Sequence, residues 1–139
     1  MFYFIWTQKI HFLFNDVDNN MRMIKTILDD IKISFEEKKE HNALRFYWKN
    51  ILVTLTFMQG NIFNTFDSIP EYDIYFERAF RIMKEETSSD FESKIIDKLN
   101  QGGLIISDSG FKSIPLKKIE ISANLSVYKE MVIGLKNYN

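Results

Sequence analysis

The apolar residues of this chain follow two different spacings, and the change falls at Gly103. Before Gly103 most apolar positions recur every three or four residues, which is typical of helices that bury one face. After it, the run Leu104–Ser107 is followed by a turn at Asp108–Gly110 and by further strand-like sequence from Phe111, which is typical of a hairpin. The spacing predicts an α+β fold that is predominantly helical, with four to five helices packed on a small antiparallel β element near the C-terminus.

The helices are predicted where apolar residues keep the helical spacing, over about 21–39, 42–59, 72–83, 90–101 and 125–135. The third range follows a capping box, Ser68-Ile-Pro-Glu71, in which Pro occupies the first helical turn. β-branched residues over 51–57 leave a strand as the alternative within the second range. Gly134 weakens the prediction for the last range.

The first twenty residues are compatible with a strand or with a helix. Apolar side chains occupy most even positions from Phe2 to Phe14, which favours a strand, whereas a stripe that includes Trp6 and Ile10 supports a helix. Met21 opens the next predicted helix, so a later start of the chain is a third alternative. The apolar run is shorter than the roughly 20 residues of a membrane span and lacks the features of a signal peptide. We therefore expect no membrane span.

Length and composition favour one globular domain over residues 1–139, because 139 residues is a common size for a single domain. Hydrophobic residues make up 45% of the chain, which is enough to form a core without disulfides. The chain has no cysteine, which excludes disulfides, thiol catalysis and thiolate zinc sites. These features fit a reducing compartment, and we expect a cytoplasmic protein.

No set of residues predicts catalysis or metal binding. The two histidines, His11 and His41, have no orienting acid, nucleophile or further ligand at a recognisable spacing. Adjacent carboxylates such as Glu36 and Glu37 point about 100° apart if they lie in one helix, whereas an acid/base pair must face across a cleft. We expect no enzyme activity, no cofactor and no metal.

Charge is distributed unevenly, with nine acidic and four basic residues between Asp67 and Asp97. We predict that this acidic stretch binds a protein partner, which its charge suggests is basic. The predicted partner-binding residues are Glu71, Asp73, Glu77, Glu85, Glu86 and Asp90. Residue types that are enriched in interfaces also occur, namely Tyr3, Trp6, Tyr47, Trp48, Tyr72 and Tyr75. The sequence thus favours a small protein-binding module, such as a stoichiometric inhibitor, antitoxin or immunity-type protein, and leaves a homo-oligomer as an alternative.

A second function follows from the order of elements near the C-terminus. A short helix over 90–101 followed by a hairpin over 104–116 resembles the last part of a winged helix, which would make the chain a DNA-binding regulator. The helix, however, carries Asp90, Glu92 and Asp97, and phosphate contact requires an excess of basic residues. We therefore rank nucleic acid below protein as the partner.

Overall fold

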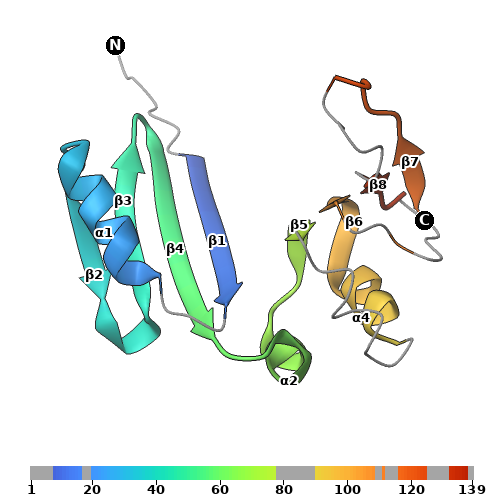
Figure 1. Cartoon of the computed structure of the whole chain (residues 1–139), viewed down its shortest axis with the longest axis horizontal. Helices are drawn as coiled ribbons and strands as arrows, with labels where there is room; N and C mark the ends of the chain where they lie inside the picture. Colours follow the sequence, from blue (N-terminus) through green and yellow to red (C-terminus); the bar gives the residue numbers. More distant parts are fainter. Residues whose placement is uncertain are drawn as a thin grey trace, which may run out of the picture. The chain divides into compact units, whose positions relative to one another are not determined.

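The computed structural model describes residues 8–16, 20–77, 90–108, 111, 116–124 and 132–137. The contacts within the chain separate it into two compact units, Met1–Ser68 and Ile69–Asn139. Each unit is built around its own sheet, as Figure 1 shows. The expectation of one domain over 1–139 is not decided by this division and stays a prediction.

The prediction of a predominantly helical fold is wrong. Strands account for 48% of the structure and helical residues for 28%. The described residues form two four-stranded sheets and three α-helices, in place of four to five helices on one small C-terminal β element. No helix among them is long and apolar enough to cross a bilayer.

The N-terminal unit has one helix against a mixed sheet. Its elements are β1 (Gln8–Asp16), α1 (Met21–Asp30), β2 (Phe35–Lys38), β3 (Ala43–Trp48) and β4 (Ile51–Gln59), followed by the short helix α2 (Ile62–Thr65). The strands lie in the order β1-β4-β3-β2, with β1 parallel to β4 and the other pairs antiparallel. Of the alternatives left open for the first twenty residues, the strand is the one observed over residues 8–16.

The core of this unit lies between α1 and the half of the sheet formed by β2 and β3 (Figure 1). Met21 and Leu28 of α1 pack with Leu44 of β3, and Phe35 and Phe46 close the cluster. A salt bridge of 3.0 Å between Lys25 Nζ and Glu37 Oε2 also ties the helix to β2. The helix therefore covers the antiparallel end of the sheet.

The helix predicted over 21–39 ends earlier, at Asp30. The amide of Lys32 donates to the Asp29 carbonyl at 3.1 Å, and the amide of Ile33 donates to the Leu28 carbonyl at 2.9 Å. This pair of bonds is a Schellman motif, which needs a left-handed residue, and Lys32 has φ 62°. The chain then leaves the helix and enters β2, because Ile33 and Phe35 join the core from an extended backbone.

The helix predicted over 42–59 is wrong, since these residues form the hairpin of β3 and β4. Trp48 pairs with Ile51 across a two-residue turn, in which Lys49 has φ 54°. The strand alternative for 51–57 is confirmed. The β-branched residues of this range suit a pleated sheet, and β4 gains a second partner in β1 along its whole length.

The C-terminal unit has the same kind of mixed sheet. Its elements are β5 (Tyr72–Glu77), α4 (Phe91–Lys98), β6 (Leu99–Ser107), β7 (Lys117–Ile119) and β8 (Val132–Leu135). The strand order is β5-β6-β8-β7, with β5 parallel to β6 and the other pairs antiparallel. The core contains Phe91 and Ile95 of α4 together with Leu99 and Ile105 of β6, all of them buried.

Gly103 lies inside β6 and does not end a helix as its neighbourhood suggested. A Cβ added there would lie 2.7 Å from Leu99 Cδ1 and 2.8 Å from the carbonyl oxygen of Asp73. Asp73 belongs to β5, so the missing side chain lets these two strands approach. The glycine therefore serves strand packing.

The other C-terminal predictions have mixed outcomes. The helix predicted over 90–101 is confirmed only for Phe91–Lys98, which form α4, because residues 99–101 already belong to β6. Residues 72–77 form β5 in place of a helix, and 78–83 lie outside the described residues. Residues 132–135 form β8, which corrects the helix predicted over 125–135 in its described part. Within the described residues, Leu104–Ser107 of the hairpin predicted over 104–116 belong to β6 and pair with β5 on one side and β8 on the other. Residues 109–110 and 112–115 of that hairpin lie outside the described residues. No wing is therefore seen in the part of the chain that the structure describes, and we do not propose DNA binding.

Candidate protein-binding surface

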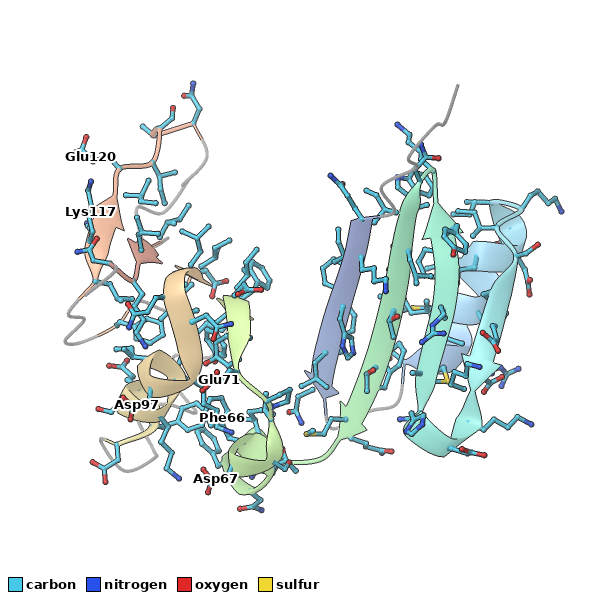
Figure 2. The ribbon with its side chains drawn as sticks, turned by 180° about the vertical axis from the view of Figure 1, so that it is seen from behind. Phe66, Asp67, Glu71, Asp97, Lys117 and Glu120 are labelled. Atoms are coloured by element: carbon cyan, nitrogen blue, oxygen red, sulfur yellow. The ribbon has the colours of Figure 1, made fainter. Side chains whose placement is uncertain are left out.

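The residues predicted to bind a partner differ in exposure among those that the structure describes. Glu71 and Asp73 are exposed near the start of β5, and Asp90 is exposed just before α4. The side chain of Asn100 donates to Asp73 Oδ1 at 2.9 Å. Figure 2 shows Glu71 and Asp97 at one end of the C-terminal unit, away from Lys117 and Glu120 at the other. Glu85 and Glu86 lie outside the described residues.

Glu77 is a core residue, with only 6% of its surface exposed. The Ser107 hydroxyl donates to its Oε1 at 2.6 Å, and the Tyr75 hydroxyl donates to its Oε2 at 2.9 Å. These bonds satisfy the carboxylate inside the unit. Of the six predicted residues, Glu77 is therefore directed inward, whereas Glu71, Asp73 and Asp90 remain accessible.

Two tyrosines complete this buried polar cluster. Burial raises the pKa of the Tyr75 hydroxyl far above its ordinary value, and the nearby Glu77 carboxylate raises it further. Burial and Glu77 also raise the pKa of Tyr72, whose hydroxyl donates to the Ile95 carbonyl at 2.6 Å. Both hydroxyls therefore stay protonated and act as hydrogen-bond donors.

The position of the cluster resembles that of a ligand site, but its burial does not. Glu77 and Ser107 are the last residues of two neighbouring parallel strands, and ligands of α/β sheets often bind at such carboxyl ends. The Ser107 side chain is 0% exposed, so no substrate reaches its hydroxyl in this conformation. The cluster holds the ends of β5 and β6 together and is better explained as a structural network.

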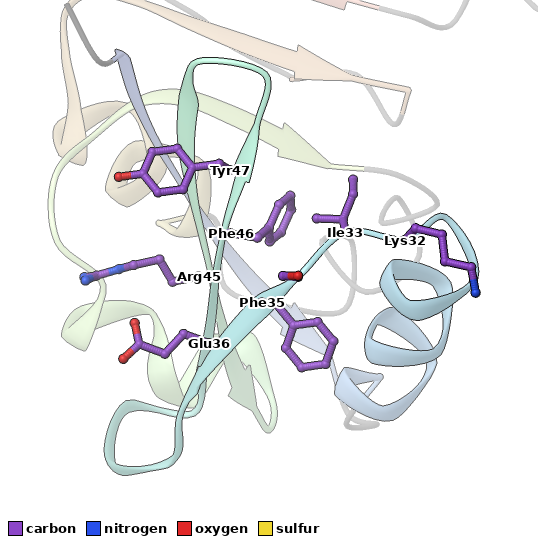
Figure 3. A pocket seen from close by; sticks show the side chains of 8 residues that line it. Lys32, Ile33, Phe35, Glu36, Arg45, Phe46 and Tyr47 are labelled. Atoms are coloured by element: carbon purple, nitrogen blue, oxygen red, sulfur yellow. The ribbon is translucent and has the colours of Figure 1, made fainter. Parts of the chain in front are cut away.

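A surface hollow of about 470 Å³ opens at one end of β2 and β3 in the N-terminal unit (Figure 3). Its lining comes from the loop after α1 and from both strands: Lys32, Ile33, Ser34, Phe35, Glu36, Arg45, Phe46 and Tyr47. We call it the β2–β3 hollow. Its size falls in the range of ligand and peptide pockets.

Unequal strand lengths create the hollow. The ladder between β2 and β3 ends at the pair Phe35–Phe46, whereas β3 continues through Tyr47 and Trp48. These last two residues pair only with β4, so no strand shelters their other side. Tyr47 is 60% exposed and Trp48 49% exposed as a result.

The charge around the hollow is predominantly positive. Glu36 lies opposite Arg45 in the ladder, but its carboxylate is hydrogen-bonded to Lys38. That bond, with Lys38 and Arg45 as nearby cations, lowers the pKa of Glu36. Neither Arg45 nor Lys32 forms an ion pair within the described ranges. The lining therefore includes two cations, with Arg45 on the same side of the hollow as Tyr47 and Lys32 on the other side (Figure 3).

Sequence reasoning identified part of this surface by residue type. Tyr47 and Trp48 were among the six aromatic residues expected at an interface, and both are exposed. Tyr72 and Tyr75 are instead partly buried in the polar cluster, and Tyr3 and Trp6 lie outside the described residues. Lys32, Glu36 and Arg45 were missed, although the run Arg45-Phe-Tyr-Trp48 combines the three residue types that dominate interface hot spots.

No protein-family model matches this chain, and neither a curated protein nor a solved structure matches it significantly. Within the described part of the chain, no three His, Cys, Asp or Glu residues are grouped so that they could hold a metal ion. The β2–β3 hollow is therefore judged on its own geometry.

Proposed function

We propose that this chain is a stoichiometric protein-binding module and that the β2–β3 hollow is its main contact surface. The observation that carries the proposal is the exposure of Arg45 and Tyr47, which line the hollow from the same face of β3. Arg, Tyr and Trp are the residues whose truncation most often weakens protein complexes, typically by about 2 kcal/mol or more at a hot spot.

The backbone at the rim of the hollow supports the same proposal. Lys32 holds a left-handed conformation that costs a non-glycine residue about 1–2 kcal/mol, and glycine is the usual residue at this position of a Schellman motif. Sparsely populated backbone conformations of this kind often occur at functional sites. Lys32 and Arg45 together favour a partner segment that carries carboxylates beside apolar groups.

The class of an inhibitor, antitoxin or immunity-type protein remains part of the proposal. Glu71, Asp73 and Asp90 are exposed, so the C-terminal unit offers acidic residues to a basic partner. Such contacts mainly accelerate association and are screened by salt. If the rate of association is the same at low and high salt, the acidic residues do not contribute to binding. The hollow is then the contact.

The test is to capture the tagged chain at low salt from its native host and identify bound proteins by mass spectrometry. The variants Tyr47→Ala and Arg45→Ala should each lose the partner. Phe76→Ala is the matched control, because Phe76 is an equally exposed aromatic residue in the other unit. Retention of a stoichiometric partner by both hollow variants would overturn the assignment of the hollow, and the absence of any protein partner would overturn the function itself.

A further inference from the structure

β1 forms one edge of the N-terminal sheet and has an open outer side. It pairs with β4 along all of Gln8–Asp16 without a register shift, and no other described strand pairs with it. Within the described residues of the N-terminal unit, the outer side of this long, regular strand therefore has no strand partner. Such an edge is a template for another strand.

The strand at the opposite edge of the same sheet, β2, has features that disfavour pairing with another chain. β2 has only four residues, and Glu36, Glu37 and Lys38 are three of them. Short, charged strands are a common device against edge-to-edge association. β1 has nine residues, no proline and a single lysine, Lys9.

β1 also carries apolar side chains that other elements leave open. Ile10, Phe12 and Phe14 are 41%, 46% and 46% exposed. Their register partners are Val53, Leu55 and Phe57, so the three lie on one face of the sheet. The rings of Phe12 and Phe14 stack at 6.1 Å, and those of Phe14 and Phe57 at 5.7 Å. This row of rings runs to the open edge.

We infer that β1 is a dimerisation strand, which pairs antiparallel with β1 of a second copy of this chain about a twofold axis at Phe12. The N-terminal sheets of the two copies, each of four strands, then become one continuous sheet. This surface is separate from the β2–β3 hollow, so the inference does not depend on the proposed function.

The sequence of β1 is self-complementary in this register. Phe12 lies opposite Phe12 and Ile10 opposite Phe14, which extends the apolar row across the axis. On the other face Lys9 lies opposite Asn15. The Asn15 amide nitrogen donates to the Met58 carbonyl at 3.1 Å and to Thr65 Oγ1 at 3.3 Å, which leaves its Oδ1 to accept from the Lys9 ammonium.

The alternative orientation is less favourable. An in-register parallel pair would set Lys9 against Lys9, and like charges directly opposite are destabilising. The antiparallel register keeps the lysine away from its own copy. The position of Lys9 therefore favours antiparallel pairing of the two β1 strands over parallel pairing.

The absence of cysteine from the chain allows a direct test. In the variant Phe12→Cys the only thiols of a dimer face each other across the axis, where directly opposed residues have Cα atoms about 4.5–5.5 Å apart, within the range for a disulfide. Mild oxidation should give a disulfide-linked dimer. Gln8→Cys is the register control, because residue 8 lies opposite residue 16, and it should remain largely uncrosslinked.

The oligomeric state of the full chain provides the second measurement. Sedimentation velocity should show a concentration-dependent dimer for the wild type and its loss for Phe12→Lys, with Phe76→Lys as a control that keeps the dimer. Circular dichroism verifies that the lysine variants are folded. A wild-type chain that stays monomeric at every concentration, or equal crosslinking of the Phe12→Cys and Gln8→Cys variants, would overturn the inference.

Discussion

The two sheets of this protein have the same pattern of strand directions, but the chain connects their strands in a different order. In each, a parallel pair forms one side and two further strands continue antiparallel. In the N-terminal unit the chain passes from β1 through α1 to the far edge and returns through β3 to β4. In the C-terminal unit β6 follows α4 and lies directly beside β5. Similar sheets can thus arise from different connections.

The edges of the two sheets repeat one contrast. β2 and β7 are short and charged, the latter with Lys117 and Lys118 among three residues. β1 and β5 are longer and expose apolar side chains, which in β5 are Ile74 and Phe76. The edge of β5 is interrupted by a register shift between Tyr72 and Ile74, whereas that of β1 is regular. This difference singles out β1 as the edge suited to pairing.

The cores differ in polarity. The N-terminal core is an apolar cluster around Leu44, whereas the C-terminal core also encloses the Glu77–Ser107–Tyr75 network. Buried networks of this kind cost free energy when one member is removed, because the remaining groups lose their partners. The two units should therefore respond differently to substitution and to pH.

The largest effects should come from truncating the apolar core of each unit. Leu44→Ala and Ile105→Ala remove fully buried side chains, and each should lower the free energy of unfolding by about 2–5 kcal/mol. If the chain is the single cooperative domain predicted from its sequence, both variants lower the midpoint of one thermal transition in calorimetry. Two transitions, each shifted by only one of the variants, would show two domains.

The next largest effect should come from the buried carboxylate. Glu77→Gln keeps the shape of the side chain but turns one acceptor into a donor that faces a hydroxyl, and it should cost about 1–3 kcal/mol in urea unfolding. Glu71→Gln, at an exposed position, should stay within about 0.5 kcal/mol of wild type. Equal effects of the two variants would contradict the structural role of the network.

The tyrosines of the C-terminal unit should make stability depend on alkaline pH. The pKa values of Tyr72 and Tyr75 are raised in the folded chain, so above the ordinary value of 10.0 the unfolded chain releases protons that the folded chain retains. Stability should therefore be unaffected by these groups below about pH 10 and fall as the pH rises beyond it. Urea midpoints measured from about pH 8 to 11 should fall less steeply for Tyr75→Phe. A wild-type curve that stays flat would disprove the linkage.

The smallest effect should be a gain of stability. Lys32→Gly relieves a left-handed lysine and should stabilise the N-terminal unit by about 1 kcal/mol. Lys118→Gly, in the extended strand β7, is the control and should slightly destabilise. A loss of stability in Lys32→Gly would mean that the lysine side chain has a structural role at the hollow.

The elements that sequence could predict are those fixed by local signals. α4 and the start of α1 follow from apolar spacing, and the alternation from Ile10 to Phe14 indicates β1. The residues of β3 and β4 are predicted as a helix because their apolar positions also fit the helical spacing. The two strands pair locally across a two-residue turn, but β4 has a second partner in β1, some forty residues earlier, as the 2.8 Å contact of His11 Nε2 with Thr56 Oγ1 illustrates.

The candidate site was only partly predictable for the same reason. The residue types of Tyr47 and Trp48 indicate an interface, and their exposure agrees with that indication. The hollow exists because β3 extends past Phe46, where its ladder with β2 stops at Phe35. The length of each strand is set by its pairing with other segments. The burial of Glu77 also depends on the meeting of β5 with β6, which lie thirty residues apart at Glu77 and Ser107.

The parallel pairing of β1 with β4 has a consequence for protein synthesis. Gln8 pairs with Ile51, so the ribosome must add forty-three residues after Gln8 before the ladder can begin. At about 5–20 residues per second this takes roughly 2–9 seconds. During that interval the nine residues of β1 are part of the nascent chain without the strand they pair with. The parallel pair can therefore form only after the whole α1–β2–β3 segment between its two strands has been made.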